Sequence, residues 1–280
     1  MNPRGFLRLG RRAWLGGSIG LLAAGCVKKS ALMARDFATR IRPAPAGLSL
    51  EPAPPARVYW MRVLSAKVPS RTANGRLWDE MGGWPDPKVV VEADGRKLLE
   101  TPGVANTMKP TFEDGPSGNF EIDAEAKMTV TLFDADTLND RPIGRKPFRA
   151  PTEVEAATGT MTIDVGKIGN PGSVTLAVEP AHPLIGLGFD YELFETKPVI
   201  SKVLKHSPAA RVGIEVGDVL VGARDVLFRD LDAKAIKSAI NTITTEPVQL
   251  IVQHDGGTTE NFSIAEGPVY ALYDEWGDVP

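Results

Sequence analysis

The feature that most constrains the fold is a series of short β-branched and aromatic runs, each ended by Gly, Pro or Asp. In the first module, expected over residues 56–181, the runs are Val58 to Val63, Lys88 to Glu92, Met128 to Phe133, Met161 to Val165 and Val174 to Val178. Runs of this length and spacing predict the strands of an antiparallel β-sandwich. We therefore expect a mostly β protein in which any chemistry lies in the loops.

Residues 182–268 show a different alternation of elements, which predicts a second module. An extended run opens at 182 and alternates through 190–194. Further strands are expected at 198–204, 248–253 and 260–264, and 216–221 is expected to form a turn that leads into a strand. A short helix follows Pro208 and stops at Gly213, and a longer one covers 233–243 with Ile236, Ala239, Ile240 and Ile243 on one face. A chain of 280 residues accommodates two such modules.

The amino terminus has the architecture of a signal peptide over residues 1–25. Four arginines precede an apolar run from Ala13 to Ala24, which is too short for an ordinary membrane span. Cys26 is the only cysteine and follows the small residues directly, so it cannot form an intramolecular disulfide. The position predicts either lipidation of Cys26 or plain secretion with a buried thiol.

The segment Leu22-Ala23-Ala24-Gly25-Cys26 resembles a bacterial lipobox. That resemblance implies a diacylglycerol on Cys26, a membrane anchor, and a place in the bacterial cell envelope. Residues 26–55 are rich in Pro and Ala and predict a semi-rigid spacer, with one short helix at 30–41. Residues 269–280 are expected to form an acidic tail.

The charge and the motif content exclude several classes of function. A net charge of -3 with mixed signs gives no basic field, so we expect no nucleic-acid partner. No serine-hydrolase, metalloprotease or phosphate-loop motif is present, and the three histidines are scattered. His206 and Ser207 adjoin in an expected turn, where a loop role is favoured over catalysis. We expect no enzymatic activity.

Two acidic segments stand out in the first module, at residues 79–87 and 133–140. Calcium prefers six to eight oxygen ligands of the kind that such segments supply. Alternation places Asp134 and Asp136 on one side of an extended segment, where they repel unless a cation or water separates them. The other interpretation is that Asp, Gly and Pro simply make turns here.

The first module resembles the C2 domain, a family that binds calcium and phospholipids. The matching features are the run at Val58, Asp86-Pro87, the segment 106–112, and Asp134-x-Asp136 followed by Ile143-Gly144. The resemblance implies an eight-stranded sandwich with calcium held by Glu80 or Asp79, Asp86, Asp134, Asp136 and Asp140. Lys88 stands where the family has Tyr, and many members of the family have lost calcium.

Residues 182–268 resemble a PDZ domain, through Gly186-Leu187-Gly188-Phe189 and the segment from Ser207 to Leu220. The resemblance implies that backbone amides of the glycine loop hold the carboxylate of a peptide, which then extends the sheet along the next strand. The terminal pocket is expected to be lined by Leu187, Phe189, Ile236 and Ile240, although the two isoleucines are equally suited to the core. We expect Gly188→Val to hinder the peptide without unfolding the module.

Together these features predict a lipid-anchored envelope adaptor. Its second module is expected to bind protein carboxyl termini or extended peptides, and its first module to contact calcium, a membrane or another protein. The alternative is a non-catalytic regulatory subunit of an envelope protease.

Overall fold

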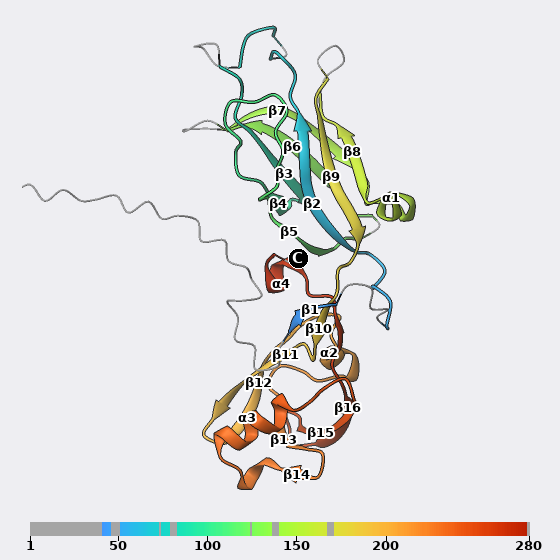
Figure 1. The fold of residues 1–280 in the computed structure, drawn as a ribbon, viewed down its shortest axis with the longest axis vertical. Helices are drawn as coiled ribbons and strands as arrows, with labels where there is room; N and C mark the ends of the chain where they lie inside the picture. Colours follow the sequence, from blue (N-terminus) through green and yellow to red (C-terminus); the bar gives the residue numbers. More distant parts are fainter. Residues whose placement is uncertain are drawn as a thin grey trace, which may run out of the picture.

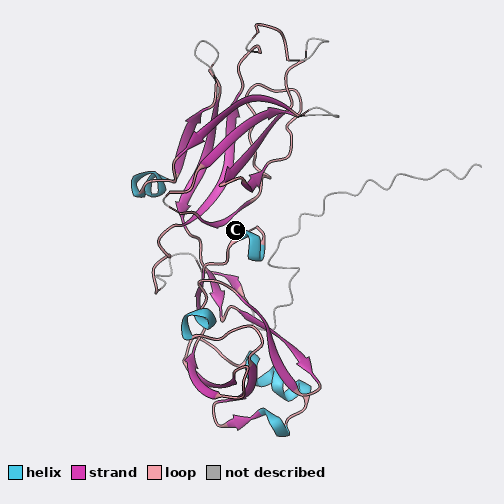
Figure 2. Ribbon diagram, turned by 180° about the vertical axis from the view of Figure 1, so that it is seen from behind, coloured by secondary structure: helices cyan, strands magenta, loops and turns pink. Residues whose placement is uncertain are grey.

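The protein is mostly β, as predicted, and its sheets are antiparallel. The computed structural model describes residues 41–45, 51–72, 74–78, 83–123, 125–135, 140–166 and 171–278. Figure 1 shows two β-rich modules at opposite ends of the long axis, with the short helix α4 (Tyr273–Trp276) between them. In Figure 2 the few helices lie at the periphery of the sheets.

The first module contains two four-stranded sheets. One has the order β5-β2-β9-β8, formed by Ser117–Glu121, Val58–Lys67, Ser173–Pro180 and Thr160–Asp164. The other has the order β4-β3-β6-β7, formed by Arg96–Glu100, Pro87–Ala93, Met128–Asp134 and Arg141–Phe148. All five predicted runs are strands, while β4, β5 and β7 were not predicted.

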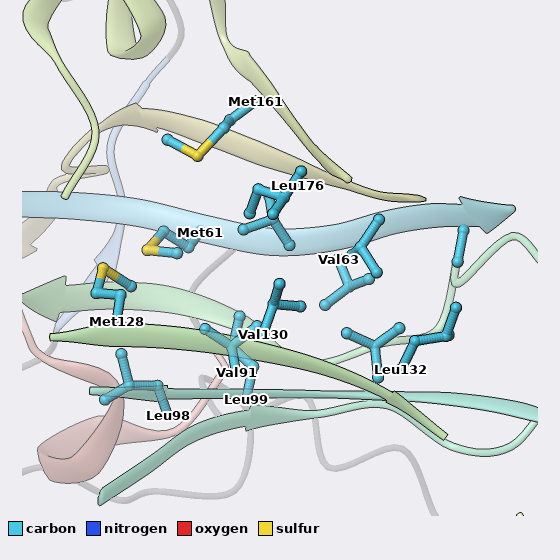
Figure 3. Close-up of a cluster of buried hydrophobic side chains, with 14 of the residues drawn as sticks. Met61, Val63, Val91, Leu98, Leu99, Met128, Val130, Leu132, Met161 and Leu176 are labelled. Atoms are coloured by element: carbon cyan, nitrogen blue, oxygen red, sulfur yellow. The ribbon is translucent and has the colours of Figure 1, made fainter. Parts of the chain in front are cut away.

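The two sheets share one apolar core. Met61 and Leu176 contribute to it from β2 and β9, and Val91 and Leu132 from β3 and β6. These four side chains are at most 1% exposed. Figure 3 shows the two sets facing each other across the layer between the sheets. Burial of one such side chain stabilises the fold by about 1.5–3 kcal/mol.

Helix α1 (Glu153–Thr158) lies beside this core and was not predicted. Thr152 caps its amino end in a capping box with Glu155, and Gly159 ends it with a left-handed φ of 77°. Arg149 and the cap bonds from Thr152 lower the pKa of the Glu155 carboxyl to about 2. The residues that begin and end this helix are therefore both present in the local sequence. The helix itself is only six residues long.

The second module contains a sheet of order β11-β12-β13-β15-β16, with β14 beside β13. Its strands are Phe189–Phe194, Lys197–Val203, Val219–Ala223, Val248–Gln253 and Thr259–Ile264, with Val226–Leu227 as β14. The predicted helices occur as α2 (Pro208–Val212) and α3 (Ala233–Asn241), and a 3-10 turn, η1, covers Phe228–Asp230.

A fourth sheet, of three strands, joins segments that are far apart in the chain. Its order is β1-β10-β17, formed by Arg42–Pro43, Leu184–Gly186 and Gly267–Val269. Trp276 of α4 is 1% exposed and packs with Ile41 and Val269 in one cluster. The segment expected as an acidic tail is therefore folded up to Trp276, and part of the expected spacer is folded with it.

Several predicted features lie outside the described residues. They are the signal peptide, Cys26, the start of the spacer with its expected helix, and the candidate ligands Asp79, Glu80 and Asp136. Across the described ranges, no helix has both the length and the apolar character that a membrane crossing requires.

Candidate functional site

The glycine turn between β10 and β11 is held by close packing. Gly188 has a φ of +79°, and a Cβ added to it would lie 2.1 Å from the Cβ of Ser207. A Cβ on Gly186 would lie 2.8 Å from Cγ1 of Ile41. Both positions therefore require glycine for the fold itself. The expectation that Gly188→Val spares folding is wrong, because valine would strain the backbone and overlap Ser207.

Ser207 and His206 hold this turn against helix α2. The Ser207 hydroxyl donates to the Gly188 carbonyl at 3.4 Å and accepts from the Ala210 amide at 3.2 Å, which caps α2. The His206 carbonyl accepts from the Tyr270 amide at 3.4 Å. These contacts are those of a loop and a helix cap, the role that the sequence favoured for the pair.

Strand β11 is the outermost strand of its sheet within the described part of the chain. It pairs with β12 on one side, with Leu193 opposite Pro198 and Phe194 opposite Lys197. Phe194 is 58% exposed. Burial raises the pKa of Tyr191 to about 12. An outer strand that follows a glycine turn is a template onto which an extended peptide can add.

The residues expected to line a terminal pocket are all core residues in this structure. Leu187, Phe189, Ile236 and Ile240 are at most 2% exposed and belong to one cluster with Leu250. The alternative left open for the two isoleucines is therefore resolved towards the core in this conformation. A pocket for a ligand's last side chain would require these side chains to move, so its specificity stays a prediction.

The acidic end of the first module has its own internal donors. Asp134 is 2% exposed, accepts from the Asp86 amide at 2.9 Å, and accepts from the Arg141 guanidinium at 3.1 Å. The same guanidinium donates to the Trp78 carbonyl at 3.0 Å. The Asp86 carboxylate accepts a hydrogen bond from the backbone amide of Asn106 at 2.6 Å. Both carboxylates thus have donors within the protein.

Asp140 is compensated by a second cation, Lys88. The Lys88 ammonium contacts Asp140 and also lies 3.1 Å from the Glu100 carboxylate, and its side chain is 16% exposed. The bond to Asp140 raises the pKa of Lys88. Among the described residues, no group of three or more His, Cys, Asp or Glu is arranged to hold a metal ion.

No family model matches the chain, and no curated protein matches it. Solved structures similar to it include a C2 domain with 16% identity and a TM-score of 0.33, covering 44% of this chain and 97% of that chain. A C2 domain of plant Extended Synaptotagmin 1 has 14% identity and a TM-score of 0.33, covering 45% and 96%.

The calcium-bound pair of C2 domains of Extended-Synaptotagmin 2 has 10% identity and a TM-score of 0.35, covering 78% of this chain and 85% of that chain. C2 domains are thus the recurrent structural neighbours.

The described carboxylates do not fit the calcium ion that the C2 resemblance implies. Asp86, Asp134 and Asp140 are engaged by backbone amides, by Arg141 and by Lys88 respectively. An ion at this place would have to displace two protein cations, since both already supply the positive charge that clustered carboxylates require.

Asn119 is a structural residue that sequence reasoning missed. It is fully buried on β5, donates to the carbonyls of His182 and Ala271 at 2.8 and 3.1 Å, and accepts from the His182 amide at 2.8 Å. One side chain therefore joins the first module to the start of the second module at His182 and to the carboxyl-terminal segment at Ala271. No sequence signal pointed to it, because the strand β5 that carries it was not predicted.

A cavity of about 500 Å³ lies at this junction, lined from both modules. Its charges are paired: Arg96 lies 3.0 Å from Asp274, and Lys205 contacts Glu121. The bond from Lys205 lowers the pKa of Glu121. The cavity therefore presents matched charges rather than a field of one sign.

Proposed function

We propose that the second module binds extended peptides in the manner of a PDZ domain, by adding them as a strand to the edge of β11. The observation that carries the proposal is that β11 is an outer strand in the described chain and directly follows the glycine turn at Gly188. Strand addition obtains affinity from main-chain hydrogen bonds, which do not require an open side-chain pocket.

In this proposal the peptide carboxylate is bound by backbone amides. The turn itself contains no Lys or Arg. Arg42, from the neighbouring strand β1, forms a two-pronged ion pair with Glu266 at 3.0 and 2.9 Å, so its charge is already matched. We therefore assign the binding of the carboxylate to backbone amides of the turn.

We further propose that Cys26 carries a lipid and that the chain is an envelope adaptor. The support is the signal-like amino terminus followed by the only cysteine. Metabolic labelling with a clickable fatty acid tests this step. The wild type should incorporate the label and Cys26→Ser should not, whereas equal labelling would contradict lipidation.

For the first module we infer a contact surface for a membrane or a protein. Arg141 and Lys88 there compensate Asp134 and Asp140, two of the carboxylates that the C2 resemblance assigns to calcium. This inference makes the contact independent of calcium.

The experiment for the peptide site compares two peptides that differ only at their ends. One ends in valine with a free carboxylate and the other is amidated, and their affinities for the full mature chain are measured by fluorescence anisotropy. The free acid should bind more tightly, since charge-assisted hydrogen bonds are roughly twice as strong as neutral ones. Equal affinities would contradict binding of the carboxylate by the turn.

A further inference from the structure

The direct connection between the two modules is short. Strand β9 ends at Pro180 and β10 begins at Leu184. Between them, the His182 ring stacks on Trp60 with ring centroids 4.4 Å apart, and the His182 backbone is bonded to Asn119. If this connection were the only crossing, it would act as a hinge, because a few residues between two elements can absorb large changes in φ and ψ.

A second segment of the chain crosses the same junction. This segment, residues 270–278, is called the strap here and directly follows β17, which pairs with β10. Leu272 of the strap forms a parallel bridge with Asn119 on β5, the outer strand of a sheet in the first module. The Asp278 carboxylate accepts from the Ser117 amide at 3.2 Å. The two modules are therefore joined at two places, and Figure 1 shows α4 of the strap between them.

The strap contributes to an apolar cluster at the junction itself. Tyr270 and Leu272 pack with Val58 of β2 and with Ala181, and all four residues are at most 7% exposed. The cluster thus contains residues of the first module, the direct connection and the strap. Domains of one chain are expected to move relative to each other unless apolar contact between them opposes it. Opening this junction would expose the cluster to water, which is unfavourable.

Gly118 allows the strap to lie close against β5. A Cβ added to Gly118 would lie 2.8 Å from Cδ2 and 3.0 Å from Cβ of Tyr273. The Tyr273 ring also stacks on Phe120, with ring centroids 5.2 Å apart. A side chain at position 118 would therefore push the strap away from the strand, although a valine there is otherwise well suited to a strand.

The strap is bound equally closely to the second module. The Lys202 ammonium donates to the Glu275 carbonyl at 2.6 Å, and the Lys205 amide donates to the Glu275 carboxylate at 3.2 Å. Trp276 is 1% exposed and packs with Leu204 in one cluster. The strap therefore contacts the second module through α4 and the first module through β5.

We propose that the strap locks the two modules into one rigid body. Two crossings and a shared apolar cluster remove the rotation that the connection between Pro180 and Leu184 alone would permit. The outer edge of β11 and the surface of the first module then keep one mutual orientation, so partners on the two modules are held at a fixed separation. The inference concerns the protein without a ligand and does not depend on peptide binding.

Distances between spin labels on the two modules test the proposal. The labels are attached through Val154→Cys and Val216→Cys, at positions that are 71% and 63% exposed. The chain is the full sequence from residue 26 onward and also carries Cys26→Ser, which removes the only native thiol. Double electron–electron resonance measures the distribution of distances. With the strap in place, the distribution should be narrow and have a single maximum.

Two substitutions release the strap from different sides. Gly118→Val places a side chain against Tyr273, and Leu272→Asp introduces an unpaired charge into the apolar cluster, where it is unfavourable. Each should broaden the distribution to about twice its width, because modules joined by one short connection sample a range of orientations.

Asp274→Asn is the matched control on the same strap. It removes only the ion pair with Arg96, in which both side chains are exposed, and such pairs contribute little. The distance distribution of this variant should match that of the labelled chain with an intact strap.

Hydrogen exchange shows whether each module stays folded in the two variants. The amides of Leu176 and Leu250 should keep their exchange rates, because these residues belong to the separate cores of the two modules. A broad distribution in the chain with an intact strap would overturn the inference, as would a narrow one in both variants. Faster exchange at Leu176 or Leu250 in both variants would also overturn it, since the strap would then stabilise a module instead of locking two.

Discussion

The glycine turn of the second module and the acidic end of the first module were both predicted from motifs, and they differ in what they offer a ligand. The turn at Gly188 and the outer strand β11 offer backbone groups, whose direction follows from the fold. The acidic end offers side chains; in the described chain Asp134 and Asp140 are engaged by Arg141 and Lys88, and Asp86 by a backbone amide.

This difference shows how well each kind of sequence motif predicts a binding site. A backbone site persists as long as its glycines keep their conformation, because neighbouring side chains change it little. A carboxylate site depends on every cation near it. A single lysine such as Lys88, where the C2 family has Tyr, is enough to neutralise the charge of one of its carboxylates. The glycine motif is therefore the more reliable of the two indications.

The largest expected effect is a loss of stability when the glycine turn is disrupted. Gly188→Val should lower the free energy of unfolding by about 2–6 kcal/mol, from backbone strain plus overpacking against Ser207. Gly256→Val is the matched control: φ there is +97° with nothing within 4 Å, so only strain of about 1–3 kcal/mol applies. Urea unfolding measures both. Equal losses would show that the contact with Ser207 is unimportant.

A smaller effect is expected at the acidic end. Arg141→Gln should cost about 1–3 kcal/mol of stability, because the buried Asp134 carboxylate loses its cation. Arg145→Gln on the same strand removes an exposed pair with Glu92 and should cost about 0–1 kcal/mol. Thermal unfolding distinguishes them. If Arg141→Gln behaves like Arg145→Gln, the guanidinium does not compensate Asp134.

The second module should also respond to pH through His254. Its hydrogen bond with Asp218, at 2.8 Å, raises the pKa of His254 above its ordinary value of 6.5. A raised pKa in the folded state gives stability that is complete below about pH 6.5 and is lost as the pH rises through the folded value.

Asp218→Asn should flatten this pH dependence in denaturant unfolding at several pH values. Asp255→Asn, in the adjoining exposed turn, should leave it unchanged. A wild-type stability that does not fall between pH 6 and pH 8 would contradict this assignment.

The smallest expected effect is that of calcium. Millimolar calcium should leave the melting temperature of the wild type unchanged, since a ligand that does not bind the native state does not stabilise it. A rise in melting temperature that Asp134→Asn abolishes would show that calcium displaces Arg141, and the comparison between the two sites would then have to be revised.

The sequence predicted the elements that carry a local signal. Runs of β-branched residues ended by turn formers identified β3 and β9, a glycine stop identified α2, and apolar residues at helical spacing identified α3. Strand β7 was not predicted, because no side chain in it is fully buried and its sequence therefore shows no apolar alternation. The acidic composition after residue 268 concealed Trp276, whose burial depends on Ile41 and Val269 from other parts of the chain.

The candidate sites divide in the same way. The turn at Gly188 was predicted because its conformation is encoded in adjacent residues. The compensation of Asp140 by Lys88 joins residues 52 positions apart, so it depends on the pairing of β3 with β6 and of β6 with β7. That strand pairing cannot be predicted from a single sequence.

The measurement that tests the central claim most directly is paramagnetic broadening by spin-labelled peptides on the full mature chain. A nitroxide at the carboxyl-terminal side of the peptide should broaden the amide signals around Gly188, and one at the amino-terminal side those around Phe194, because the proposed peptide strand runs antiparallel to β11. Broadening in the reverse order, or confined to the first module, would contradict strand addition at this edge.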